Sequence, residues 1–172
     1  MRYPIGATIG AMRLATSADA DAITNIHVSA YEASLGEVVS REVLDVASAS
    51  RLPMWRALIA EPPTGQAVFV VERDEIVGFV STGPTRESGV NGAEGEVYAL
   101  FVHPGQWKTG VGGALLVRAL EHMTSLGLSH AKLWVLDANH RARQFYESRG
   151  WSNTEVVRED DRGRFFRYAK QI

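Results

Sequence analysis

The sequence predicts one α/β domain, in which a single mixed sheet carries helices on both faces. Two pairs of alternating apolar strands, within residues 66–84 and 152–169, are each joined by a short polar turn and are typical of antiparallel hairpins. Between these pairs a strand, a helix and a second strand follow one another, which is the order that produces parallel neighbours. The length of 172 residues, with 45% hydrophobic and 22% charged residues, fits one globular domain.

The first part of the chain predicts a short strand followed by helix. Residues 1–11 are interpreted as a loose leader, and residues 12–172 as the domain. Residues 12–15 have the composition of a short strand, and Ser17 is suited to capping the helix that follows. The apolar positions of that helix recur at helical spacing, namely Ala20, Ile23, Ile26, His27 and Ala30.

Residues 40–60 have a second helical pattern. Pro53 is expected to split or kink this helix, and Pro62 with Pro63 is expected to end it. The hairpin of residues 66–84 then follows.

The central segment predicts a strand, a helix and a strand. Residues 96–102 are rich in β-branched and aromatic residues and stop at a His-Pro pair. Residues 115–126 form an amphipathic helical pattern that Gly127 ends, and residues 131–137 are apolar enough for a buried strand. A further helix is expected to begin at Asn139, a good N-cap, and to end at Gly150.

Composition excludes several classes of function. Without cysteine, the chain has no thiol nucleophile, disulfide or thiolate-ligated metal, and it suits a reducing compartment. No apolar run reaches membrane-spanning length, so we expect no membrane partner and a cytoplasmic location. A net charge of −2 without a dense basic block argues against nucleic-acid binding.

The most informative segment is the glycine-rich turn of residues 103–116, HPGQWKTGVGGALL, between the central strand and helix. Glycines let the backbone approach an anion closely, and the first N–H groups of a helix lack partners within the helix. A diphosphate would suit this turn. Two common phosphate motifs fail here, because Trp107 stands where a P-loop needs glycine, and Leu115 stands where a dinucleotide fingerprint needs a small residue.

The turn and its flanks resemble motifs A and B of the GNAT superfamily of N-acetyltransferases. Gly110, Val111 and Gly112 match the pyrophosphate-binding motif, whereas Trp107 stands at its arginine or glutamine position, with Gln106 one residue early. The segment NHRARQFYESRGW, residues 139–151, is similar to motif B in its asparagine, alanine, Phe-Tyr pair and Gly-aromatic pair. The resemblance implies a mixed, mostly antiparallel sheet of six to seven strands whose central parallel strands splay apart at the cofactor.

The resemblance also implies how acetyl-CoA would bind as acyl donor, without a metal. Main-chain groups of Leu100 and Val102, with Asn139, would contact pantetheine, and Arg143 is a candidate for the phosphate-bearing end, although an exposed helix arginine is more often only solvated. The diphosphate would lie on residues 107–114, which are Trp107, Lys108, Thr109, Gly110, Val111, Gly112, Gly113 and Ala114.

Two residues are candidates for catalysis in the direct attack of a primary amine on the thioester. Tyr146 matches the motif B tyrosine that would protonate the departing thiolate, with a core tyrosine as the structural alternative. Glu96 lies where one branch of the family carries the glutamate that acts as general base. The alternatives are that Glu96 is only a solvated side chain, and that the amine loses its proton to water.

The acceptor is expected to be an amine of a small molecule or peptide. Tyr31, Glu32 and Trp55 are candidates for lining its pocket, although the two aromatic residues equally suit packing. A non-catalytic acetyl-CoA sensor and a nucleoside-triphosphate binder are the rival interpretations. A homodimer through exposed strands, as often found in this family, stays open.

Overall fold

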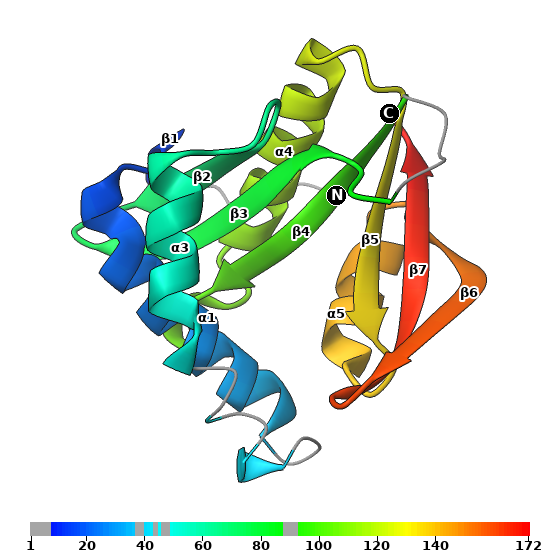
Figure 1. Cartoon of the computed structure of the whole chain (residues 1–172), viewed down its shortest axis with the longest axis horizontal. Coiled ribbons are helices and arrows are strands. Elements are labelled where there is room, and N and C mark those ends of the chain that lie inside the picture. Colours follow the sequence, from blue (N-terminus) through cyan, green and yellow to red (C-terminus); the bar gives the residue numbers. More distant parts are fainter. Residues whose placement is uncertain (1–7, 37–39, 43–44, 46–48, 88–92) are drawn as a thin grey trace.

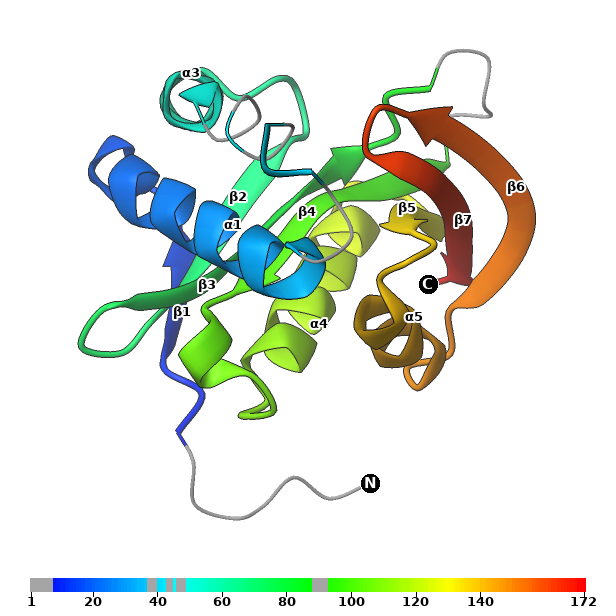
Figure 2. The ribbon, with the colours of Figure 1, turned by 90° about the horizontal axis from the view of Figure 1, so that it is seen from below.

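The computed structural model describes residues 8–36, 40–42, 45, 49–87 and 93–172, which form one seven-stranded sheet with helices on both of its faces. Figure 2 shows α1 and α3 on one side of the sheet and α4 and α5 on the other. The strands are β1 (Ala11–Leu14), β2 (Ala67–Glu72), β3 (Ile76–Pro84), β4 (Glu94–Val102), β5 (His130–Leu136), β6 (Ser152–Asp160) and β7 (Gly163–Gln171). The helices are α1 (Ala20–Leu35), α3 (Arg51–Ala60), α4 (Val111–Ser125) and α5 (His140–Glu147).

The strand order is β1-β2-β3-β4-β5-β7-β6, and every pair is antiparallel except β4 with β5. That parallel pair extends over three positions only, from Glu94 opposite His130 to Glu96 opposite Lys132. Beyond Glu96 the two strands diverge, as Figure 1 shows. The predicted mixed, mostly antiparallel sheet of six to seven strands with a splayed parallel pair is therefore confirmed.

A β-bulge in β4 lies just beyond the last paired position. Ala99 is opposite Ser81 and Val97 is opposite Thr82, so Tyr98 is the extra residue. A bulge bends its strand and strengthens the local twist. The bulge thus falls at the place where β4 leaves β5.

Each face of the sheet has its own apolar core. The larger core lies under α4 and α5 and includes Leu115, Met123 and Tyr146. The smaller core lies under α1 and α3 and is centred on Trp55 and Phe79. The sheet is therefore covered on both faces, as the sequence predicts.

Two predictions about helices differ from the structure. Helix α4 begins at Val111 rather than Leu115, because Gly110, at φ 91°, caps it and the next two glycines form its first turn. Pro53 is in the first turn of α3, where a missing N–H costs no helical hydrogen bond, so α3 is not split there. Of the helical pattern over 40–49, residues 43–44 and 46–48 lie outside the described residues.

The expected leader extends to residue 11, of which residues 1–7 lie outside the described residues. Ala11 begins β1, and Ile9 packs against the larger core and accepts a hydrogen bond from Arg73. No helix in the described part of the chain is long and apolar enough to cross a membrane.

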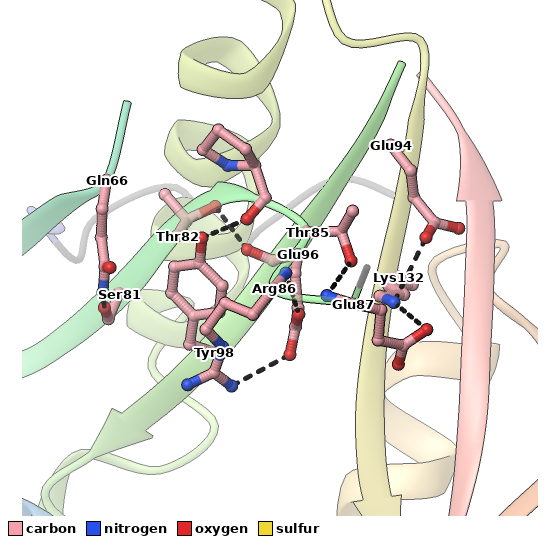
Figure 3. Close-up of polar contacts among 11 residues, drawn as sticks. Gln66, Ser81, Thr82, Thr85, Arg86, Glu87, Glu94, Glu96, Tyr98 and Lys132 are labelled. Atoms are coloured by element: carbon pink, nitrogen blue, oxygen red, sulfur yellow. Dashed lines mark hydrogen bonds and ion pairs between the residues drawn. The ribbon is translucent and has the colours of Figure 1, made fainter. Parts of the chain in front are cut away.

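A buried ammonium group stabilises the paired part of β4 and β5. Lys132 of β5 is fully buried, and its Nζ forms ion pairs with Glu87 and, at 3.3 Å, with Glu94 (Figure 3). The ammonium of Lys132 lowers the pKa of Glu87 mainly through a hydrogen bond. The two carboxylates compensate a charge that would otherwise be costly to bury.

We expect Lys132→Met to lower the free energy of unfolding by about 2–4 kcal/mol, because Glu94 is then left half-buried without its cation. Glu87→Gln should cost less than about 1 kcal/mol, since the side chain of Glu87 is 39% exposed and can be hydrated. Chemical denaturation measures both. Equal losses in the two variants would contradict a structural role for the buried ammonium.

A neutral histidine lies in the smaller core. His27 accepts a hydrogen bond from the Trp55 indole at 3.2 Å and stacks on Phe101, with 4.2 Å between ring centroids. Burial, followed by the charges of Arg51 and Arg162, lowers the pKa of His27 from 6.5 to about 3. Its imidazole is therefore uncharged near neutral pH.

Because the folded pKa of His27 is below its unfolded value, the unfolded state binds more protons between about pH 6.5 and pH 3. Stability contributed by neutral His27 is complete above this range and declines as the pH falls through it, by at most about 1.4 kcal/mol per pH unit. His27→Gln keeps an acceptor for Trp55 but does not titrate. Urea denaturation at several pH values should give a shallower decline for this variant, and parallel curves would contradict the assignment.

Candidate active site

Two adjoining cavities lie where β4 and β5 diverge. The larger, about 600 Å³, lies between the end of β4, the glycine-rich turn and α5. The smaller, about 200 Å³, lies between α1, the bulged part of β4, β5 and the β6–β7 hairpin. The residues that line both cavities are Ser34, Leu100, Phe101, Asn139, Ala142 and Tyr146.

The glycine-rich turn presents free backbone donors to the larger cavity. Lys108 and Gly110 both have positive φ, and the Thr109 hydroxyl donates to the Gln106 carbonyl at 2.7 Å. Within the described part of the chain, none of the backbone N–H groups from Lys108 to Gly113 donates a hydrogen bond. With the N-terminal dipole of the 15-residue α4 behind them, these amides form a site for an anion.

Most of the residues predicted for the cofactor meet at this cavity. The residues of that prediction that line it are Leu100, Val102, Trp107, Lys108, Thr109, Gly110, Gly112, Gly113 and Asn139. Val111 is fully buried in the larger core, so only its main chain is available to a ligand. Ala114 lines a neighbouring groove between β1 and α4, together with Gly110 and Gly113.

Arg143 is placed elsewhere. Its guanidinium forms an ion pair with Asp137, donates to the Tyr168 hydroxyl at 3.2 Å and lies over the Phe166 ring. Arg143 lines neither cavity, because it occupies the side of α5 that packs on β7. Its predicted contact with the phosphate-bearing end of the cofactor stays a prediction, and these contacts favour the alternative of a structural role.

Two other arginines of the same segment do line the larger cavity. Arg141 stacks over the Trp107 ring at 3.2 Å and donates to the Ser34 hydroxyl at 2.6 Å, so it joins α5 to α1. Arg149 packs on the Phe145 ring and donates to the Phe145 carbonyl. The sequence analysis missed both, although Arg149 follows Ala142 and Tyr146 at helical spacing on one face.

Trp107 fills the position at which the sequence departs from motif A. Its indole N–H donates to the Val102 carbonyl at 2.8 Å and joins the turn to the end of β4. The Gln106 side chain instead accepts a hydrogen bond from Arg73 at 2.5 Å. An anion at this turn would therefore rely on main-chain donors, because the Gln106 side chain is bonded to Arg73.

Tyr146 lies on the wall that the two cavities share. It is 9% exposed and packs edge-on against Phe145 and Trp151. Its hydroxyl has no hydrogen-bond partner within the described residues, and burial raises the pKa of this phenol. A protonated donor is thus available between the two cavities near neutral pH.

Glu96 is buried behind the bulge of β4. Its carboxylate accepts hydrogen bonds from the Arg86 guanidinium at 3.0 Å and from the Arg86 backbone N–H at 3.3 Å (Figure 3). Glu96 lines neither cavity, but the adjacent Val97 and Tyr98 line the smaller one. Its carboxylate also raises the pKa of Tyr98, after burial, to about 12.

The three residues predicted for the acceptor pocket do not lie together in the structure. Tyr31 lines the smaller cavity. Trp55 is buried in the core against His27, and Glu32 forms an ion pair with Arg41. No group of three or more potential metal ligands occurs among the described residues.

Comparison with known proteins agrees with this arrangement. Residues 21–151 match the family model described as the Acetyltransferase (GNAT) family. An uncharacterized N-acetyltransferase of Archaeoglobus fulgidus is 32% identical over 139 residues, which cover 80% of this chain and 89% of that protein. A mycothiol acetyltransferase of Thermobispora bispora is 39% identical over 90 residues, which are 51% of this chain but only 30% of the relative.

A solved structure has the same fold. The crystal structure of the PaiA N-acetyltransferase from Thermoplasma acidophilum in complex with coenzyme A superposes with a TM-score of 0.80 at 17% identity, covering 94% of this chain and 98% of the other. That protein therefore shares the fold of this chain, and its structure contains coenzyme A. With most of its length matched by the family model, this chain belongs to the GNAT family of acetyltransferases.

Proposed function

We propose that this protein transfers the acetyl group of acetyl-CoA directly to a primary amine of a small molecule or peptide. The observation that carries the proposal is the run of free backbone donors at the glycine-rich turn, next to a cavity that shares Tyr146 with a second cavity. One cavity would hold the donor and the other the acceptor.

The donor would extend from the turn to Tyr146. Its diphosphate would accept hydrogen bonds from the amides of residues 108–113, with Lys108 adding a positive charge. The pantetheine arm would lie along the β4 edge at Leu100 and Val102, which β5 does not cover. Asn139 uses its side-chain oxygen to cap α5 by accepting from the Ala142 N–H, which leaves its amide nitrogen for the ligand.

Transfer forms one C–N bond and breaks one C–S bond. The lone pair of the neutral amine attacks the thioester carbonyl carbon, and the electrons of the C–S bond leave with sulfur. The Tyr146 phenol supplies a proton to that thiolate. The phenolate regains a proton through water from the nitrogen, which loses its second proton as the amide forms. The proton that the acceptor ammonium loses passes through water to Glu96, which is buried beside the smaller cavity.

Tyr146→Phe should lower kcat by about 10²-fold or more, because general acid catalysis contributes at least that much. Thermal stabilisation by coenzyme A should be nearly unchanged, since the diphosphate amides are intact. Thiol release from acetyl-CoA measures turnover over a panel of amines. Tyr168→Phe is the matched control, because its hydroxyl is bonded to Glu147 and lies outside both cavities.

Two outcomes would argue against this role. Unchanged kcat in Tyr146→Phe would make Tyr146 a packing residue. Binding of acetyl-CoA by the wild-type protein without thiol release to any amine would instead support the non-catalytic sensor.

Glu96→Gln should lower kcat/KM for thiol release by about 10²-fold, because it removes the proposed proton acceptor. Arg86→Gln is the informative partner variant, because it removes the guanidinium bonded to Glu96 but keeps the carboxylate. It should therefore lower kcat/KM less than Glu96→Gln does. If Glu96→Gln has the kcat/KM of the wild-type protein, the proton leaves to bulk water and Glu96 is not the base.

A further inference from the structure

The smaller cavity is lined by three guanidinium groups. Arg51 comes from the start of α3, whereas Arg158 and Arg162 come from the β6–β7 hairpin. Tyr146 and Tyr31 line the same cavity. Side chains from segments far apart in the sequence thus bring positive charge beside the proposed reaction centre.

This charge is only partly compensated. Among the described residues that line the cavity, none is an aspartate or a glutamate. Arg162 forms an ion pair with Asp160, but neither Arg51 nor Arg158 has a carboxylate partner within the described part of the chain. Arg158 instead lies over the Trp134 ring, 4.4 Å from its centroid, and near Phe165.

The other titratable groups near the smaller cavity do not neutralise its positive charge. His27, which also lines the cavity, is neutral because burial and the nearby arginines lower its pKa to about 3. Burial is the main cause of the lowered pKa of both Arg51 and Arg158. The charge of Glu96 acts in the opposite direction and raises the pKa of Arg158, but Glu96 lies behind β4 and is itself bonded to Arg86.

A neutral donor completes the cavity. The Tyr31 hydroxyl is buried, lies near Arg51 and Arg162, and has no hydrogen bond of normal geometry with any described residue. A buried hydroxyl without a partner is costly, and a ligand atom that accepts its proton would remove this cost. Guanidinium groups with a phenol are donors suited to a carboxylate or a phosphate.

We infer that the acceptor amine carries an anionic group, a carboxylate or phosphate, which binds at Arg51, Arg158, Arg162 and Tyr31 while the amine is directed toward Tyr146. This inference rests on the proposed function and names its acceptor class. A cavity of about 200 Å³ admits a compact molecule of amino-acid size. Polyamines are disfavoured, because their second ammonium would meet like charge.

Matched acceptors test the inference through thiol release. The pairs are glycine with glycinamide, β-alanine with β-alaninamide, and phosphoethanolamine with ethanolamine, and spermidine is the cationic comparison. In at least one pair the anionic member should have a kcat/KM about tenfold or more above its neutral partner. The carboxylate and phosphate pairs distinguish the two anions.

Arg51→Gln and Arg158→Gln should each reduce that preference about tenfold, through a higher KM for the anionic member of the pair. Arg164→Gln is the control, because Arg164 lies on the same hairpin, pairs with Glu159 and lines neither cavity. Thermal unfolding of each variant checks that it is folded.

A binding measurement separates this inference from the proposed function. With coenzyme A at saturation, the preferred anionic amine should raise the Tm of the wild-type protein and of Arg164→Gln, but not of Arg158→Gln. Efficient transfer to neutral amines or spermidine, without anion preference, would overturn the anionic acceptor and leave transfer intact. Anion-dependent stabilisation without thiol release to any amine would support the anion site and overturn transfer.

Discussion

The site depends on one constraint, namely that two parallel strands at the centre of the sheet pair over three positions and then separate. Lys132 holds the paired end through its buried ion pairs, and the bulge at Tyr98 turns β4 away immediately afterwards. A fully paired β4 would have no free edge to offer a ligand. Because the strands separate inside the sheet, both faces contribute walls to the gap, and apolar side chains of both cores surround it.

Tyr146 divides this gap into two parts with different electrostatics. On one side the donors are backbone amides at the start of α4, which carry only partial charges, together with Lys108, Arg141 of α5 and Arg149 just beyond α5. On the other side the charges are full guanidinium charges beside aromatic rings. The first arrangement suits an extended diphosphate held by many donors, and the second suits a single compact anion.

The order of elements and the cofactor turn could be predicted from local pattern. The hairpins, the glycine-rich turn and the Phe-Tyr helix each have a signal within a continuous stretch of sequence. Their positions along the chain could therefore be predicted without knowledge of tertiary contacts. The start of α4 was wrong by four residues, because the conformation of Gly110 decides whether the next glycines precede the helix or form its first turn. The predicted contact of Arg143 with the cofactor depended on which side of α5 packs on β7. That orientation of α5 is decided by tertiary packing and cannot be read from the sequence of the helix. The arginines of the smaller cavity could not be found from sequence, since α3 and the β6–β7 hairpin meet only in the fold.

If the anionic acceptor that we propose is correct, the arginines of the smaller cavity would affect the acceptor's protonation as well as its binding. An acceptor ammonium must lose its proton before attack, and positive charge nearby lowers the pKa of an ammonium. An anionic group on the same molecule would offset that effect if it stayed free in solution, but not if guanidinium groups neutralise it. Binding the anion at Arg51, Arg158 and Arg162 would therefore hold the acceptor in place and cancel the effect of its anion on the ammonium. Under this arrangement the proposed base, Glu96, would take a proton from a more acidic ammonium, and its carboxylate, which is bonded to Arg86, would receive that proton through water.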